Sequence, residues 1–160
     1  MRILFATGNE HKISEAAAIL APLGHEVEPL LIQGKPPELI EPQAEGIVEV
    51  ALSKIEQARE LVMGTKLEDS IILVEDSGLF IDALGGFPGP YSSYVESTIG
   101  LSGIMQLMSA ESERGAEFRA IAAISIEGNT VTETGICRGK ISEQISGDMG
   151  FGYDPIFIPE

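Results

Sequence analysis

The sequence has little of what several kinds of functional site require. Its 160 residues include one cysteine, two histidines and no tryptophan. A single cysteine, Cys137, excludes an intramolecular disulfide, and a lone thiol suits a reducing compartment. Cys137 has no histidine near it in the chain, so we expect a small core residue rather than a nucleophile. The two histidines, His11 and His25, also argue against a histidine-rich zinc site.

Positive charge is scarce as well. The chain has 10 Lys and Arg residues against 25 Asp and Glu residues, which gives a formal net charge of −15. This charge argues against a broad nucleic-acid surface, because nucleic-acid phosphates need many basic contacts. A small polyphosphate is still compatible with the composition, since a divalent metal and a few lysines neutralise a site locally.

Long apolar runs are absent too. No run approaches the roughly 20 residues that span a bilayer. The short apolar start at residues 1–7 predicts a strand rather than a signal peptide. We therefore expect a cytoplasmic protein that has neither a membrane partner nor a nucleic-acid partner.

The apolar pattern that is present predicts one α/β domain over residues 1–160. Branched apolar runs predict strands, and apolar spacings of three and four predict helices. Gly128-Asn129 between two strand-like segments predicts a hairpin. Because helices come early and the hairpin late, we expect a mixed, twisted sheet flanked by helices. The predicted elements are strands at 3–6 and 71–74, helices at 10–21, 44–62 and 90–108, and hairpin strands at 118–126 and 130–136.

Two lysines lie on the apolar faces of the predicted helices. At 100° per residue, Lys54 falls on the same arc as Ile47 and Ala58, and Lys12 on the same arc as Ile19. One interpretation is snorkelling at a helix end, which is easy for Lys12 in a first turn and hard for Lys54 in mid-helix. A buried ammonium group needs a partner, so the other interpretation is that both lysines point into a cleft and hold an anion.

Two adjacent carboxylates, Glu75 and Asp76, follow a strand that we expect to be buried on both faces. Ligand sites in such sheets gather at the carboxyl ends of strands, where a carboxylate holds Mg²⁺ or takes a proton from water. Adjacent strand residues point to opposite faces, so at most one of the two enters a given site. The alternative is a turn-forming Asp in Asp76–Gly78, and the residues alone leave both interpretations open.

Two turns are further candidates for a nucleotide site. Thr7–Asn9 connects the first predicted strand to the first helix, where backbone N–H groups and the helix dipole favour a phosphate. Such turns are also common for purely structural reasons, and neither a P-loop nor a G-x-G-x-x-G pattern is present. Phe151–Asp154 combines aromatic rings with a carboxylate, which suits stacking on a base and accepting hydrogen bonds from its edge. A surface turn with a half-buried aromatic ring is the alternative, and composition alone favours it.

Three segments together resemble the inosine triphosphate pyrophosphatase family, the house-cleaning enzymes of the Ham1 type. The first segment, Thr7-Gly8-Asn9-Glu10-His11-Lys12, is similar to the family's T-G-N-x-x-K opening. The second is V-E-D-S-G-L at 74–79, continued by A-L-G-G-F-P-G-P-Y-S at 83–92, and the third is G-F-G-Y-D-P-I-F at 150–157. The three occur in order at compatible spacing, and the resemblance covers the whole chain.

The resemblance implies a fold and an activity. The fold would be α/β, with a mixed sheet and two lobes around a deep substrate cleft, in a protein that forms a homodimer. The reaction would be Mg²⁺-dependent hydrolysis of deaminated purine nucleoside triphosphates (ITP, dITP, XTP) to the monophosphate and pyrophosphate, which removes them from the nucleotide pool. A pocket built around the 6-oxo group of these bases would reject adenine, because its polar groups would stay unpaired.

The resemblance also implies a role for individual residues. Asp76 matches the catalytic carboxylate that serves the metal and the attacking water, and Glu41 is the nearest match to the second metal carboxylate. The spacing from Glu41 to Lys54 is one residue longer than expected, so Glu38 and Glu45 stay open as alternatives. The substrate-binding residues that the resemblance implies are Thr7, Gly8, Asn9, Glu10, His11, Lys12, Lys54, Ser77, Phe151, Gly152, Tyr153 and Asp154.

The chain also departs from the family pattern at its end. Members of the family continue past the G-F-G-Y-D-P loop into a segment with a Lys and a Ser-His-Arg motif that contacts the base. The chain stops at Glu160, so we expect this segment to be missing. Two alternatives to the enzyme follow: a nucleotide-binding module without turnover, and a related pyrophosphatase with another base preference, such as pyrimidines. The loop Phe151–Asp154 argues against the pyrimidine preference.

Overall fold

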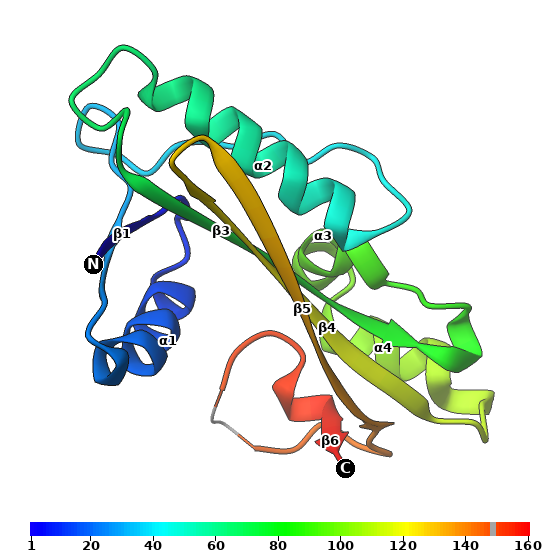
Figure 1. The fold of residues 1–160 in the computed structure, drawn as a ribbon. Helices are drawn as coiled ribbons and strands as arrows, with labels where there is room; N and C mark the ends of the chain where they lie inside the picture. Colours follow the sequence, from blue (N-terminus) through cyan, green and yellow to red (C-terminus); the bar gives the residue numbers. More distant parts are fainter. Residues whose placement is uncertain (148–149) are drawn as a thin grey trace. The chain divides into compact units, whose positions relative to one another are not determined.

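The computed structural model describes residues 1–147 and 150–160 (Figure 1). The strands are β1 (Arg2–Phe5), β2 (Glu26–Pro29), β3 (Ile71–Ile81), β4 (Gly115–Ile126), β5 (Asn129–Ile141) and β6 (Phe157–Pro159), and the helices are α1 (Glu10–Leu20), α2 (Ile47–Val62), α3 (Ser92–Thr98) and α4 (Gly100–Leu107). These strands form one sheet in the order β2-β1-β3-β4-β5-β6. β1 is parallel to β2 and β3, whereas β5 and β6 are antiparallel. The predicted α/β class with a mixed sheet is therefore confirmed.

The chain divides into two compact units. The first unit consists of Met1–Gln43, Val48–Asp76 and Ile121–Glu133, and the second of Ala44–Ile47, Ser77–Ala120 and Thr134–Glu160. The strands β3, β4 and β5 each contribute residues to both units. The substrate cleft that the resemblance implies stays a prediction.

In the first unit, α1 covers a small apolar core. Ile13, Ala16 and Leu20 of α1 pack against Ile3, Phe5 and Leu73 of β1 and β3. Ile19, which the sequence placed on the same face, is 68 % exposed, so that part of the prediction was wrong. The apolar face of α1 follows the spacing of Ile13, Ala16 and Leu20, and Lys12 therefore lies at the edge of this face.

The second helix confirms its predicted apolar stripe. The buried side chains recur at spacings of one, three and four residues and are at most 2 % exposed: Val50, Ala51, Ile55, Ala58 and Val62. Leu61 was predicted on the same stripe, but it is 41 % exposed and lies outside it. The helix begins at Ile47, three residues later than predicted, because the chain from 37 to 44 has no regular structure.

Strand β2 was not predicted from the sequence. It lies at one edge of the sheet, next to β1, with Ile3 in register with Val27. Alternating glutamates, Glu26 and Glu28, hide its apolar pattern, and Glu28 forms a 2.6 Å ion pair with Arg2 of β1. Charged residues are common on edge strands because they discourage pairing with another chain.

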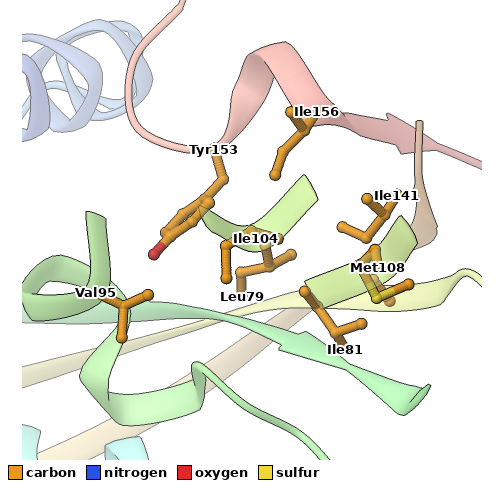
Figure 2. Close-up of a cluster of buried hydrophobic side chains, with 9 residues drawn as sticks. Leu79, Ile81, Val95, Ile104, Met108, Ile141, Tyr153 and Ile156 are labelled. Atoms are coloured by element: carbon orange, nitrogen blue, oxygen red, sulfur yellow. The ribbon is translucent and has the colours of Figure 1, made fainter. Parts of the chain in front are cut away.

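In the second unit, a larger core gathers side chains from several segments. Figure 2 shows this core, which contains Leu79, Ile81, Val95, Ile104, Met108, Ala116, Ile141, Tyr153 and Ile156. The single helix predicted at 90–108 is broken into α3 and α4, because the chain turns at Gly100, whose φ is +64°. Positive φ favours glycine and interrupts a right-handed helix. No helix among the described residues is long and apolar enough to cross a membrane.

Strand β3 extends well beyond its predicted end. It continues through Glu75 and Asp76 to Ile81, so the interpretation of Asp76–Gly78 as a turn is excluded. The sheet explains this, because β3 lies between β1 and β4 and both edges of its backbone find partners. Gly78 is required here, since an added Cβ would lie 2.3 Å from the carbonyl oxygen of Gly89.

The predicted hairpin is present as β4 and β5, but its turn is one residue earlier than predicted. Glu127 and Gly128 have φ values of +48° and +80°, as a type I′ turn requires at both central residues. Cys137 lies on β5 and is exposed, so its prediction as a core residue was wrong. β5 is mostly exposed between Asn129 and Lys140, and position on a strand alone did not reveal this.

Candidate active site

Lys54 is the centre of a charged cluster in the first unit. Its side chain is 12 % exposed, and its Nζ lies 2.5 Å from Oε1 of Glu41 and 2.9 Å from Oδ1 of Asp76. The helical stripe of α2 carries Lys54 inward, and the two carboxylates supply the partners that a buried ammonium group needs. Snorkelling to solvent is thereby excluded for Lys54.

The adjacent residues Glu75 and Asp76 reach different lysines. They lie within the extended strand β3, where neighbouring side chains point to opposite faces. Oε2 of Glu75 lies 2.6 Å from Nζ of Lys12, whereas Asp76 contacts Lys54. Oε2 of Glu75 is buried and accepts no hydrogen bond of good geometry from the described residues, so the Lys12 ammonium group balances its charge. Because neighbouring strand residues alternate in direction, Glu75 and Asp76 form separate ion pairs, one with a lysine of α1 and one with a lysine of α2.

Glu41 comes from the irregular segment before α2, and Gln57 holds that segment in place. The Gln57 side chain accepts a hydrogen bond from the Ile40 N–H and donates one to the Ile40 carbonyl oxygen, both at 2.8 Å. Gln57 lies one turn after Lys54 on α2, so the clamp sets the backbone beside Glu41 close to the Lys54 ammonium group. Of the three glutamates left open by the sequence, Glu41 is the one whose ion pair with Lys54 appears in the described part of the chain.

The pKa values in this cluster reflect burial and charge together. Burial raises the pKa of Asp76, and this effect outweighs the nearby Lys54 ammonium group, which lowers it. Burial lowers the pKa of Lys54, but the carboxylates of Asp76 and Glu41 more than offset this and leave it raised. Asp76 is thus a better proton acceptor than an ordinary aspartate, while Lys54 stays charged.

The turn Thr7–Asn9 is ordered by its own side chains. Oγ1 of Thr7 accepts the Asn9 N–H at 3.1 Å, and Oδ1 of Asn9 accepts the N–H groups of His11 and Lys12 at 3.0 and 3.3 Å. Asn9 therefore caps α1 in the usual manner. A phosphate bound at this turn would either accept hydrogen bonds from N–H groups next to the Asn9 side chain or displace that side chain. An added Cβ at Gly8 would lie 3.9 Å from Cβ of Pro36, an ordinary van der Waals contact, so other segments do not crowd this position.

The other predicted substrate residues occupy varied positions. Glu10 and His11 are exposed in the first turn of α1, and Lys12 is half-buried beside Glu75. Ser77 is half-buried in β3, directly after Asp76. The first unit therefore brings together the lysines and carboxylates that the sequence singled out.

The loop of residues 150–154 belongs to the second unit. Phe151 is 38 % exposed, whereas Tyr153 is 3 % exposed and lies in the core (Figure 2). Oδ2 of Asp154 accepts the Phe151 N–H at 3.0 Å, and Gly152 has a φ of +62°. As the loop stands, the ring of Phe151 is accessible to a ligand and the ring of Tyr153 is not. The adjoining residues 148 and 149 lie outside the described part of the chain.

The donor set of the cluster suits a hard divalent cation. Glu41 and Asp76 both direct an oxygen at one positive group, the Lys54 ammonium. The described residues contain no group of three or more His, Cys, Asp and Glu side chains arranged for a metal. Mg²⁺ is commonly held by only one or two carboxylates together with water and substrate phosphates, so this pair fits it.

Two residues of the cluster were missed or undervalued from the sequence. From the sequence, Glu75 and Asp76 were equivalent candidates. Only the ion pair between Glu75 and Lys12 distinguishes the two. Gln57 carried no signal beyond its place one turn after Lys54, because a backbone clamp depends on where a distant loop runs.

The fold and this cluster define an α/β protein in which two lysines are paired with three carboxylates. The family model of the Ham1 family matches residues 3–160, so the chain belongs to the Ham1 family. Among curated relatives, the dITP/XTP pyrophosphatase of Methanopyrus kandleri is 47 % identical over 161 residues, covering 100 % of this chain and 80 % of the relative. The dITP/XTP pyrophosphatase of Pyrococcus horikoshii is 40 % identical over 160 residues, with the same coverage.

Solved structures agree with this assignment. The Ham1 protein of Staphylococcus aureus has a TM-score of 0.78 at 26 % identity, over 98 % of this chain and 80 % of that one. A nucleoside-triphosphatase described as a dITP/XTP pyrophosphatase from Mycobacterium abscessus has a TM-score of 0.76 at 28 % identity, over 99 % of this chain and 82 % of that one. The fold expected from the sequence motifs is thus found in proteins of the same family.

Proposed function

We propose that this protein hydrolyses deaminated purine nucleoside triphosphates, such as dITP, ITP and XTP, to the monophosphate and pyrophosphate. The observation that carries the proposal is the cluster in which one buried lysine, Lys54, faces both Asp76 and Glu41. Its membership of the Ham1 family and the curated relatives named dITP/XTP pyrophosphatase support the same reaction.

Lys12 and Lys54 would bind the triphosphate. Each ammonium group is paired with a carboxylate, which holds it in a defined place. Phosphate oxygens accept hydrogen bonds from such groups strongly, and the Thr7–Asn9 turn would add backbone N–H donors at the start of α1. Positioning and charge stabilisation by these groups would supply most of the rate, because phosphoryl transfer requires little covalent chemistry from the protein.

The balance of charge favours a metal-dependent reaction. The cluster has two ammonium groups against three carboxylates, so a triphosphate would enter a site already short of positive charge. Glu41 and Asp76 would hold Mg²⁺, and Lys54 would then be released toward phosphate. When bound, the ion lowers the pKa of a coordinated water and offsets charge on the phosphates.

Asp76 would accept the proton of the attacking water. Its side chain is 11 % exposed, and without a metal, burial raises its pKa, which favours proton uptake by its carboxylate. The neighbouring Glu75 is paired with Lys12 and would not compete for this proton.

The loop Phe151–Asp154 would contact the base through residues other than the buried Tyr153, and Ser77 would contact the substrate close to Asp76. Phe151 offers an exposed ring for stacking. Backbone groups of a tight loop discriminate bases well, because a base with the wrong donor leaves them unpaired. We further propose a homodimer and a cytoplasmic location, which light scattering coupled to size exclusion and fractionation of the native cells would test.

A turnover panel tests the proposed reaction. Purified protein is incubated with ITP, dITP, XTP, GTP, ATP and UTP, with Mg²⁺ and with EDTA, and pyrophosphate is measured separately from orthophosphate. We expect pyrophosphate from ITP, dITP and XTP only, and only with Mg²⁺. Pyrophosphate from UTP at an equal rate would overturn the purine preference. Nucleotide-dependent thermal stabilisation without turnover would instead identify a nucleotide-binding module.

A further inference from the structure

Ser92, the first residue of α3, joins three segments of the second unit. It is 5 % exposed, and its Oγ accepts the Leu79 N–H of β3 at 2.8 Å and donates to the Gly89 carbonyl oxygen at 2.6 Å. Its own carbonyl oxygen accepts a hydrogen bond from the hydroxyl of Tyr153 at 2.7 Å. One small residue therefore ties the loop of residues 150–154 to the strand that carries Asp76.

Tyr153 is enclosed by this arrangement. Its ring lies among apolar side chains that include Leu79, Val95 and Ile104 (Figure 2). With 3 % of its surface exposed, the ring presents no face on which a base stacks. Its hydroxyl is directed at a main-chain carbonyl, which makes the bond independent of any side-chain rotamer on the partner.

The rest of the loop is held from inside in a similar way. Asp154 accepts the Phe151 N–H, and an added Cβ at Gly150 would lie 2.3 Å from Oδ2 of Asp154. Gly150 and Gly152 have φ values of +85° and +62°, which let the chain turn tightly on both sides of Phe151. These contacts hold the backbone of the loop on both sides of Phe151.

We propose that Tyr153 is a positioning residue for base recognition, whose hydroxyl bond to the Ser92 carbonyl oxygen holds the Phe151 turn in its binding shape. This inference rests on the proposed function, because it takes Phe151 as a contact for the base. Tyr153 does not touch the substrate and acts through Phe151. Its loss therefore weakens substrate binding and leaves the chemical step nearly unchanged.

The test is Tyr153→Phe, which keeps the ring and removes only the hydroxyl. We expect KM for dITP and XTP to rise by about two- to tenfold, the worth of one net hydrogen bond, with kcat within twofold of wild type. Binding of the monophosphate product, measured by calorimetry, weakens by the same factor. Tyr94→Phe is the matched control, because Tyr94 is 70 % exposed on α3, and its removal of a hydroxyl leaves KM unchanged.

A double-mutant cycle with Phe151→Ala separates positioning from general support of the fold. If Tyr153 acts through Phe151, then Tyr153→Phe changes KM in the wild-type background but has little further effect in the Phe151→Ala background. Additive effects of the two substitutions would overturn the inference. So would a Tyr153→Phe protein that does not fold, because the hydroxyl would then serve the core of the second unit and not the loop.

The same experiment distinguishes the inference from the function on which it rests. If Phe151→Ala weakens product binding and Tyr153→Phe does not, the positioning role is wrong and base contact by the loop stands. If Phe151→Ala changes neither product binding nor the preference among ITP, ATP and UTP, then base recognition by this loop fails, and the positioning role fails with it.

Discussion

Residues 75–76 and residues 77–81 belong to one strand, β3, but they meet different surroundings. Glu75 and Asp76 face ammonium groups of two helices in the first unit. In the second unit, Leu79 and Ile81 are fully buried among apolar side chains, and Gly78 leaves no room for a Cβ beside Gly89. Ion pairs balance the charges of residues 75–76, whereas close packing fixes residues 77–81.

The difference explains how a polar cluster is kept in place without being rigid itself. Ion pairs tolerate small shifts and respond to ligands, whereas close-packed segments do not tolerate changes of even one methyl group. Because the strand is continuous, the close-packed residues that follow Asp76 hold its backbone while its side chain stays available for chemistry. Substitutions in the first stretch should therefore change activity, and those in the second should change stability.

Asp76→Asn should have the largest effect. Pyrophosphate release is expected to fall by about 10²–10⁴-fold, the usual contribution of a general base. The pH dependence of stability should change as well. The pKa of folded Asp76 is raised, so its favourable contribution is complete below its ordinary pKa and is lost as pH rises through the folded pKa. Asparagine never ionises, so the stability of wild type should fall relative to that of Asp76→Asn as pH rises from 4 to 7.

The control for Asp76→Asn is Asp76→Glu, which keeps the charge and moves the carboxylate. It should lose activity while keeping the pH dependence of wild-type stability. Steady-state pyrophosphate assays and thermal unfolding between pH 4 and pH 8 measure both effects. Near-normal turnover in Asp76→Asn would contradict the assigned role.

Gly78→Ala should have the next largest effect, this time on stability. An alanine Cβ would lie 2.3 Å from the Gly89 carbonyl oxygen, which is backbone and has little freedom to move. We expect a loss of about 3 kcal/mol in the free energy of unfolding, at the upper end of overpacking effects. Urea denaturation provides the measurement, with Gly8→Ala as the matched control, because its nearest contact is 3.9 Å away. Equal free energies of unfolding for Gly78→Ala and Gly8→Ala would contradict the idea that close packing constrains residues 77–81.

Lys54→Met should combine a loss of activity with a new dependence on metal. Without the ammonium group, Glu41 and Asp76 lose their shared counter-charge, and the free energy of unfolding should fall by about 2 kcal/mol in EDTA. Mg²⁺ should restore more stability to the variant than it adds to wild type, since it would balance the same carboxylates. Thermal unfolding with and without Mg²⁺ measures this, and Lys66→Met at an exposed lysine provides the control. A Tm that is insensitive to Mg²⁺ in both proteins would argue against a metal at Glu41 and Asp76.

The ionisation of Tyr153 should give the smallest effect. Burial, with the nearby Glu96 carboxylate, raises its pKa from 10.0 to about 12. A raised folded pKa gives stability that is complete below pH 10 and is lost as pH rises toward 12. Absorbance at about 295 nm, where tyrosinate absorbs, should show a late ionisation that is missing in Tyr153→Phe. If the titration curve of Tyr153→Phe matched that of wild type, Tyr153 would not be the tyrosine that ionises late.

Local patterns in the chain were sufficient for several features of the fold. The stripe of α2 places Lys54 inward, and the structure confirms its burial. The hairpin follows from a similarly local signal. In each case the physical cause acts within a few residues, so the sequence contains it.

Other features depend on neighbours that are remote in the chain. The residues of Asp76–Gly78 left a turn open as one interpretation, yet strands on both sides of β3 keep the segment extended. Tyr153 reads as a surface aromatic, yet a core assembled from several segments encloses it. Cys137 reads as a core residue, yet nothing covers enough of β5 to bury it in the described part of the chain.

The sequence by itself thus determined the family motifs, most of the helical faces and the residue types of the candidate site. Tertiary structure alone decided which carboxylate meets which lysine, that Gln57 holds the segment carrying Glu41, and that Phe151 rather than Tyr153 is exposed. The physical reason is the distance along the chain over which each effect acts. Periodicity and capping act over a turn of helix, whereas pairing and burial depend on where distant segments pack.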